Sequence, residues 1–267
     1  LYERVANSEF QPKFHTIHSF CETLLRRFPQ EAGVDTNFTI LDEHGAKTLL
    51  RTASELILQQ LQGPKSNKSE GDISCISQYV NNESFSRLLD LLVADRWRLE
   101  KFLRNNDENR ISCAIAEMLG LSRLTSPDLL VQVACANTHI DAESWRSSVC
   151  YLQAGSKTDH ARAQTIDEWI SASQHTRREL FEKYCAAFLT RDQLPIKTLV
   201  SASTLAKKPD ALLALRAEQS RLLEITTKIK RAKIVQCSSA LLNLTKKILE
   251  QFSQEKIKQN CLDYNDL

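Results

Sequence analysis

Apolar residues recur at spacings of three and four along most of the chain, which is the pattern of helices that bury one face. The first helix is expected to begin at His18 and to be ended by Pro29 and Gly33. Asp42 is a suitable N-cap for the next helix, which is expected to run to about Gln62. The same spacing predicts further helices over residues 72–81, 84–105, 108–120, 126–137, 141–153, 159–189 and 210–258.

Two short segments are expected to be extended instead. Phe14–Ile17 has the character of a strand, and Phe38–Leu41 alternates apolar and polar residues. Residues 63–71 are polar and contain glycine and proline, so they predict a loop, and residues 190–210 are expected to be irregular. Because the whole chain contains six glycines and six prolines, few residues break helices, and the sequence indicates an all-α or nearly all-α domain over about residues 43–255.

Composition excludes some classes of protein. The chain has 267 residues, of which 42% are hydrophobic and 25% charged, as in ordinary globular domains. No apolar run approaches the roughly 20 residues that a membrane span needs. Eight scattered cysteines with no Cys-x-x-Cys pair predict no metal site and reduced, buried thiols in a cytoplasmic protein. Because the chain begins at Leu1 and its only methionine is Met118, we expect an internal piece of a longer protein.

Positive charge is concentrated in the last quarter of the chain. Residues 191–262 contain 14 Lys and Arg against 6 Asp and Glu, whereas the net charge of the whole chain is +2. The basic segment has a short first group, Lys207–Lys208, and a denser second group made up of Lys228, Lys230, Arg231 and Lys233. Such a segment suits a polyanion. A solvated helix face has the same composition, so both interpretations stay open.

The residues of common catalytic sites are missing from the sequence. Hydrolysis of a nucleotide requires a Gly-x-x-x-x-Gly-Lys-Ser/Thr cradle, and none of the six glycines is followed by another five positions later. His15, His18 and Cys21 are close in sequence, but a Cys-His enzyme would need a third partner and oxyanion donors that the pattern does not supply. We therefore expect no catalytic residue in this chain.

The segment around Thr16 is the most informative one for binding. If a strand delivers Thr16 and a helix begins near His18 and Ser19, hydroxyls and helix N-terminal amides would meet where a phosphate oxygen can be held. His18 and Phe20 would add a donor and a stackable ring. The alternative is a plain capped helix start, with Phe20 in the core.

The same segment resembles a family motif. Residues 16–20 (Thr-Ile-His-Ser-Phe) are similar to the DNA-contacting Thr-Phe/Ile-His-Ser/Ala-Phe motif of UvrD/Rep-type superfamily 1 helicases. Residues 21–33 resemble the stretch directly after this motif in the AddA group, the helicase–nuclease subunits of bacterial AddAB enzymes. At the other end, residues 262–267 (Leu-Asp-Tyr-Asn-Asp-Leu) resemble the segment that precedes the Walker B motif, with Asn265 in place of the commoner Asp.

The resemblance covers the whole chain and implies how it is divided. Residues 43–255 would form the helical 1B-type subdomain that is inserted in a RecA-like α/β motor domain. Residues 1–42 and 256–267 would be short pieces of that motor domain, 1A, and would lie near each other in space. The parts of the chain that resemble the family also include Phe188–Thr190 and Lys197–Val200.

The resemblance also implies a function for the longer protein. It would be an ATP-dependent, Mg²⁺-requiring DNA helicase with a nuclease, acting on single-stranded and double-stranded DNA in double-strand break repair and recombination with an AddB-like subunit. Within that protein, this chain would bind DNA and would not hydrolyse ATP. The residues expected to contact DNA are Thr16, His18, Ser19 and Phe20, with Lys228, Lys230, Arg231 and Lys233 as a secondary contact.

Two other functions stay open. The chain could be a helical protein-interaction module that docks a partner subunit or other helicase domains, which a large exposed apolar patch would favour. An enzyme in its own right is the second alternative, and the missing site chemistry argues against it.

Overall fold

A computed structural model describes residues 15–61, 74–81, 83–85, 87–88, 91, 95–122, 125–136, 142–205 and 210–267. Contacts divide the chain into two compact units. Unit 1 contains Leu1–Glu108 and Ala240–Leu267, and unit 2 contains Asn109–Ser239. The predicted loop at 63–71 and the Lys207–Lys208 group lie outside the described residues.

The first described helix of unit 1, α2 (Ile17–Arg27), begins one residue earlier than predicted. Thr16 is its N-cap and has an extended backbone. His15 and Thr16 form no strand and Ile17 is helical, so the strand predicted at Phe14–Ile17 is wrong over its described part, and Phe14 lies outside that part. The reason is local. The side chain of Thr16 accepts the Ser19 amide and so starts a helix, which leaves the following residues unable to pair as a strand.

A short helix, α3 (Pro29–Ala32), follows and places proline at its first position. Gly33 ends it with a φ of 67°, a left-handed conformation that glycine adopts without strain. The predicted helix break at Pro29 and the stop at Gly33 are therefore confirmed.

Two strands far apart in sequence form a parallel pair. β1 (Thr39–Leu41) pairs with β2 (Cys261–Asp263) in the register Thr39 to Cys261 and Leu41 to Asp263. The strand predicted at Phe38–Leu41 is confirmed. All of residues 42–260 connect these two adjacent strands. Two segments near opposite ends of the sequence therefore lie side by side in unit 1.

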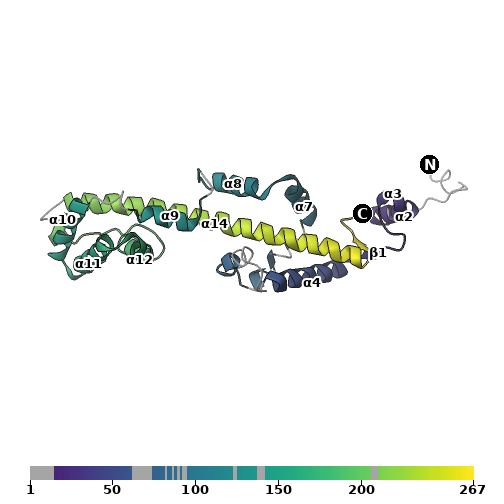
Figure 1. Ribbon diagram of the computed structural model, residues 1–267, viewed down its shortest axis with the longest axis horizontal. Helices are drawn as coiled ribbons and strands as arrows, with labels where there is room; N and C mark the ends of the chain where they lie inside the picture. Colours follow the sequence, from purple (N-terminus) through teal and green to yellow (C-terminus); the bar gives the residue numbers. More distant parts are fainter. Residues whose placement is uncertain are drawn as a thin grey trace, which may run out of the picture. The chain divides into compact units, whose positions relative to one another are not determined.

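Three long helices provide most of the described core of unit 1. They are α4 (Glu43–Leu61), α7 (Arg96–Asn105) and the C-terminal part of α14 (Asp210–Lys258). Asp42 caps α4, since its Oδ1 accepts the Gly45 amide at 2.7 Å, as predicted. Buried side chains of α4 and α14, such as Ala53 and Phe252, form one apolar cluster, against which Leu99 and Leu103 of α7 pack. In Figure 1, α4 and α7 flank α14 from two sides.

Unit 2 is entirely helical in its described regular structure. Its helices, besides the first half of α14, are α8 (Glu108–Met118), α9 (Pro127–Ala134), α10 (Ala142–Gln153), α11 (Lys157–Ser171), α12 (Gln174–Ala186) and α13 (Ala202–Leu205). Their common core contains Trp169, whose ring stacks on Tyr184 at 4.1 Å between centroids. The Tyr184 hydroxyl donates to Glu218 of α14 at 2.9 Å, so a buried polar contact ties α12 to the long helix.

Two predicted helices are interrupted. The helix expected over 159–189 is divided into α11 and α12, because Ser173 caps α12 by accepting the Thr176 amide at 3.2 Å. Arg177 donates to the backbone oxygens of Trp169 and Ile170 at the end of α11, at 2.9 and 2.7 Å. The helix expected over 84–105 is interrupted at Asp95, a turn residue after which α7 begins. The long helix predicted over 210–258 is confirmed.

The cysteines only partly behave as predicted. All eight thiols are free. Cys135, Cys185 and Cys261 are buried, but Cys113 and Cys150 are exposed, so the expectation of buried thiols is wrong for these two. In the described part of the chain, no helix combines the length and the apolar character that crossing a bilayer requires.

Candidate nucleic-acid interface

The N-terminus of α2 places the predicted DNA-contacting residues on one exposed turn. Thr16 Oγ1 accepts the backbone N–H of Ser19 at 3.3 Å, and Ser19 Oγ lies 3.2 Å from Nδ1 of His15. Thr16, His18 and Phe20 are exposed and Ser19 is half-buried. Because the first turn of α2 contains no acidic residue, its amide groups and hydroxyls can approach an anion without repulsion.

Phe20 is 53% exposed, and α2 has no buried residue at all. The alternative that Phe20 belongs to the core is therefore wrong within this chain. Ile17, Leu24 and Phe28 are also exposed, to 75%, 41% and 46%. Spacings of three and four place Ile17, Phe20 and Leu24 along one stripe of α2, and Phe28 lies at its C-cap.

The other end of the chain contributes to the same place. The ring of Tyr264, directly after β2, lies 5.0 Å from the imidazole of His18, with the ring planes tilted by 58°. Tyr264 is itself 48% exposed. The two family-like motifs, one near each end of the sequence, are thus in direct contact. Their proximity was an expectation from the family resemblance, but this particular pair of rings was not.

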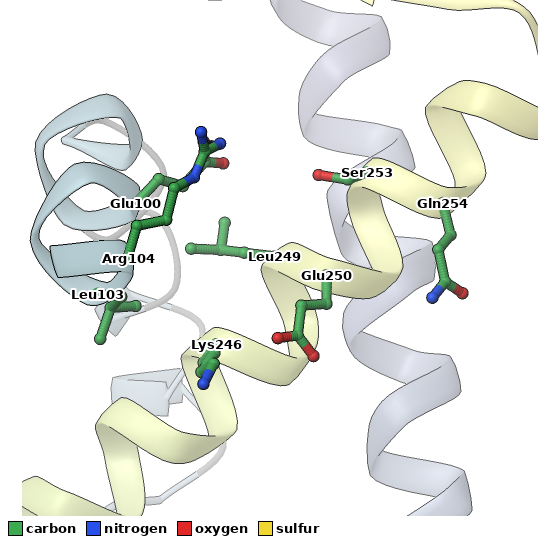
Figure 2. A pocket seen from close by; sticks show the side chains of 8 residues that line it. All are labelled: Glu100, Leu103, Arg104, Lys246, Leu249, Glu250, Ser253 and Gln254. Carbon is green, nitrogen blue, oxygen red and sulfur yellow. Dashed lines mark ion pairs between the residues drawn. The ribbon is translucent and has the colours of Figure 1, made fainter. Parts of the chain in front are cut away.

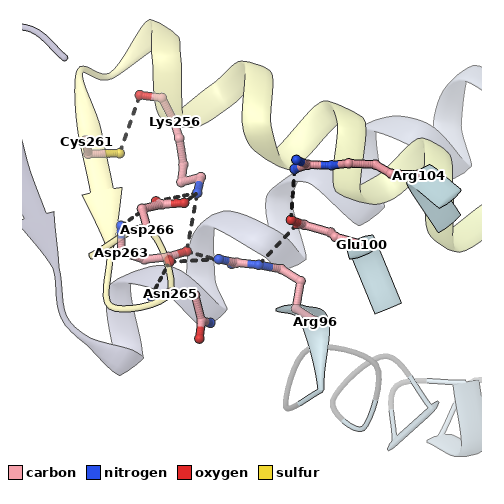
Figure 3. Close-up of polar contacts among 8 residues, drawn as sticks. All are labelled: Arg96, Glu100, Arg104, Lys256, Cys261, Asp263, Asn265 and Asp266. Atoms are coloured by element: carbon pink, nitrogen blue, oxygen red, sulfur yellow. Dashed lines mark hydrogen bonds and ion pairs between the residues drawn. The ribbon is translucent and has the colours of Figure 1, made fainter. Parts of the chain in front are cut away.

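A buried ionic network fixes the segment that carries Tyr264. Figure 3 shows Arg96 of α7 extending toward Asp263, whose two carboxylate oxygens accept Nη1 and Nη2 at 2.6 and 2.7 Å. Lys256 binds Asp266 at 2.5 Å and lies 3.6 Å from Asp263. Burial raises the pKa of Asp263, but the Arg96 guanidinium and the Lys256 ammonium outweigh it, so the pKa is lowered. The network keeps Asp263 ionised and connects the segment after β2 to α7 and α14.

The basic group on α14 does not form a single stripe. Lys228 and Arg231 are three positions apart and share one side of the helix, whereas Lys230 and Lys233 share another. Lys228 is paired with Glu224 at 2.6 Å, and a side chain added at Gly120 would lie 3.2 Å from Arg231 Nη1, so Arg231 reaches the end of α8.

Lys230 and Lys233 line a cavity of about 1110 Å³ between α9, α12 and α14. Arg178 and Arg191 line the same cavity, and nothing in the sequence groups these two with the lysines. Three acidic residues also lie on its wall, namely Asp128, Glu179 and Glu182. The cavity is therefore mixed in charge and less suited to a polyanion than the lysines alone suggested.

A second, smaller groove of about 460 Å³ lies between α7 and α14 in unit 1. In Figure 2, Leu103 and Leu249 are among its apolar lining, and Glu100, Arg104, Lys246 and Glu250 provide charges of both signs. Among the described residues, no group of three or more His, Cys, Asp and Glu side chains is arranged to hold a metal ion.

Comparison with known proteins gives two matches. The profile of the UvrD/REP helicase N-terminal domain matches residues 2–267. A protein of Carboxydothermus hydrogenoformans, named as the A-type subunit of an ATP-dependent helicase/nuclease, is 29% identical over 93 residues. Those residues are 35% of this chain and 7% of the relative, so the match spans a small part of the relative's length. No solved structure matches the chain.

Proposed function

Because the chain belongs to the UvrD/REP helicase family, we propose that it is the DNA-binding part of an AddA-type helicase, built from a 1B-type helical insertion and short pieces of the motor domain. The resemblance to AddA-like members of this family is confirmed by the two matches. In the proposed division, residues 1–42 and 256–267 belong to motor domain 1A, and residues 43–255 form the insertion.

The parallel pairing of β1 with β2 supports this division. Adjacent parallel strands need a crossover connection, and here the crossover is the entire helical region between Leu41 and Cys261. A two-stranded parallel sheet is too small to be stable by itself and is normally covered on both faces. The pair therefore fits the edge of a larger sheet, from which a helical domain leaves and to which it returns.

DNA binding is assigned to Thr16, His18, Ser19 and Phe20. The observation that carries this proposal is the exposed first turn of α2, where hydroxyl and amide donors lie beside the aromatic pair His18 and Tyr264. A helix N-terminus holds a phosphate, and an aromatic ring stacks on a base. Lys230 and Lys233 are proposed as a secondary contact, together with Lys228 and Arg231.

The wider activity belongs to the proposal for the longer protein. It would be an ATP- and Mg²⁺-dependent helicase with nuclease activity, working in the cytoplasm with an AddB-like subunit in double-strand break repair. ATP would be held elsewhere, since no glycine pair here has the spacing of a phosphate cradle. The 267-residue chain alone should accordingly show no ATP hydrolysis with or without DNA, measured as phosphate release. Turnover proportional to its concentration would contradict this.

The DNA assignment is tested in the full-length protein with the double substitution Thr16→Ala and His18→Ala. DNA-stimulated ATP hydrolysis should fall while the DNA-independent rate stays nearly unchanged. A matched control is His44→Ala with Thr48→Ala, which removes an exposed histidine and threonine from α4. Thr16→Ser keeps the capping hydroxyl, so it separates loss of the cap from loss of the contact. If DNA stimulation survives in the folded double variant, the segment is only a helix start.

One observation favours a second function, a protein-interaction module. The exposed side chains of Ile17, Phe20 and Leu24 on α2, with Phe28 at its C-cap, are the apolar surface that such a module would bury against other helicase domains. Replacing Leu24 and Phe28 with serine should then weaken assembly of the full-length protein or its complex, without a specific loss of DNA stimulation. Size-exclusion chromatography and the ATPase ratio distinguish the two functions.

A further inference from the structure

Helix α7 presents a solvent-facing surface made of aromatic and basic side chains. Trp97 is 58% exposed and Phe102 is 46% exposed. The opposite side of the helix holds Arg96, which is 4% exposed, and Leu103, which packs on the core of unit 1. The helix is therefore strongly two-sided, but its outer side is not simply polar.

Trp97 differs from the other two tryptophans of the chain. Trp145 is 8% exposed and Trp169 is 1% exposed, because both belong to the core of unit 2. Leaving a large indole in water forfeits the favourable burial of its apolar area. The Trp97 ring stays exposed although the preceding residue, Arg96, is buried. This arrangement indicates a binding surface.

The exposed charges of α7 close to Trp97 in the sequence are mostly basic, and Asp95 and Glu100 pair with two of them. The ammonium of Lys101 lies 5.2 Å from the centroid of the Trp97 ring. Arg98 is 77% exposed and lies 3.6 Å from Asp95, and Arg104 is 80% exposed and lies 3.5 Å from Glu100. An ion pair between two exposed groups, such as Arg98 and Asp95, contributes little. The Arg98 guanidinium can therefore turn to a stronger anion at small cost, whereas Glu100 is 26% exposed and also lies 3.3 Å from Arg96.

The position of α7 is fixed by Arg96. The same bidentate contact with Asp263 that holds the return strand also holds the helix one residue before Trp97. A rigid support lowers the entropy lost when a ligand binds to the ring.

We propose that this surface, made of Trp97, Arg98, Lys101 and Phe102 with Arg104 at its edge, binds single-stranded nucleic acid. A base would stack on Trp97, and backbone phosphates would pair with Arg98 and Lys101. Aromatic rings between cations are the usual means by which single strands are bound without sequence preference. Aromatic residues and arginine are also enriched in protein interfaces, whereas lysine is depleted there, so a protein partner is the alternative outcome of the test. The inference rests on the proposed DNA-binding function and adds a surface separate from the first turn of α2.

The test uses the tryptophan itself. An oligothymidylate is titrated into the 267-residue chain while tryptophan fluorescence and the anisotropy of a label on the oligonucleotide are recorded together. Binding should quench the fluorescence in the native sequence. Trp97→Phe should abolish the quenching while the anisotropy still reports binding, because Trp145 and Trp169 are buried. Trp97→Ala should weaken binding roughly 5-fold or more, the loss expected for one stacked base.

Arg98→Ala with Lys101→Ala should weaken binding and reduce the slope of log affinity against log salt by about 1.4, since two phosphate contacts are lost. The control is Lys47→Ala with Tyr79→Ala, an exposed lysine and an exposed tyrosine elsewhere in unit 1, which should bind like the native chain. Circular dichroism checks that each variant is folded.

Quenching that persists in Trp97→Phe, or unchanged affinity in Trp97→Ala, would overturn the inference. If the oligonucleotide binds without quenching, the assignment of nucleic-acid binding to α7 is wrong. A protein partner would then be the remaining explanation for the exposed surface. If the chain does not bind the oligonucleotide at all, this inference fails, while the DNA assignment of α2 is judged separately by the ATPase ratio in the full-length protein.

Discussion

Arg96 and Asp263, 167 positions apart in the sequence, form a bidentate ion pair with distances of 2.6 and 2.7 Å. Their side chains are 5% and 3% exposed. Arg96 belongs to a helix of the proposed insertion, and Asp263 belongs to the strand by which the chain returns. The pair therefore joins α7 to the segment after β2, on which Tyr264 meets His18.

Removing one member of this pair should be costly. Arg96→Ala leaves Asp263 buried with only Lys256 nearby, so unit 1 should lose about 3 kcal/mol of its free energy of unfolding, the lower end for a broken buried pair. Asp263→Ala combined with Arg96→Ala should cost less than the sum of the single changes. Hydrogen exchange of the backbone amides of α4 and α7 in urea, which reports the unfolding of unit 1 separately from unit 2, measures both.

The control for that experiment is Arg87→Ala. Arg87 is paired with Glu83, but the two side chains are 76% and 75% exposed, so the change should stay within about 0.5 kcal/mol. Equal effects of Arg87→Ala and Arg96→Ala would show that the buried pair contributes nothing special.

Unit 2 should lose stability in acid because of Asp159. Burial raises the pKa of this carboxyl, but hydrogen bonds from Ser201, Ser156 and Thr204 outweigh it and lower the pKa from 3.8 to about 2. The folded state therefore binds the proton less tightly than the unfolded state. A stabilisation of roughly 2 kcal/mol is present above the unfolded pKa and is lost as pH falls through the folded pKa.

The measurement is the free energy of unfolding of unit 2 as a function of pH, in the native chain and in Asp159→Asn. The native chain should lose stability between pH 3.8 and about 2, and the variant should be less stable at neutral pH with a flatter profile in that window. Asp167→Asn, an exposed position on the same helix, should change stability by less than about 0.5 kcal/mol. An identical profile for Asp159→Asn would contradict the prediction.

The hydrogen-bonded groups of Asp159 and Thr204 leave no room for a side chain at position 155. A Cβ at this position would lie 2.5 Å from Oδ2 of Asp159 and closer still to Oγ1 of Thr204. Gly155→Ala should therefore destabilise unit 2 by about 1–3 kcal/mol, as overpacking does. In an Asp159→Ala, Thr204→Ala background the same change should cost less, because the two nearest crowding oxygens are gone and only the Cβ of residue 159, at 2.9 Å, remains. If Gly155→Ala lowers the free energy of unfolding equally in both backgrounds, contacts with Asp159 and Thr204 are not the cause of the destabilisation.

The thiols should react in two groups. Cys113 and Cys150 are exposed and should be modified by a thiol reagent in the folded chain. Burial raises the pKa of Cys185 to about 12, so this thiol is neutral at ordinary pH and should react only after unfolding. Mass spectrometry of labelled peptides before and after adding urea distinguishes the groups. Early labelling of Cys185 would mean that unit 2 opens locally.

Local features of the sequence were enough to predict most helices. Apolar spacing and caps depend on residues within one or two turns, so the limits of α4 and α14 and the stop at Gly33 could be predicted from the sequence alone. The same reasoning failed where a single residue had two local options. Ser173 could continue a helix or cap the next one, and it caps.

The candidate site was only half visible in the sequence. Residues Thr16 to Phe20 could be selected from their types and from a family resemblance. Arg178 and Arg191, which join Lys230 and Lys233 at one cavity, could not, because they come from other segments of the chain. Trp97 and Lys101 could not be selected as binding residues either. A spacing of four places two side chains on the same side of a helix, but it does not say whether that side is buried or exposed.

Periodicity, breakers and net charge depend on neighbours in the chain, so the sequence by itself determined the helical class and the basic C-terminal region. Tertiary structure decided which distant residues meet: β1 with β2, His18 with Tyr264, and Arg96 with Asp263. The physical reason is that such contacts depend on how whole helices pack. A strand pair or a buried ion pair is favourable only after the intervening residues have folded and excluded water from it.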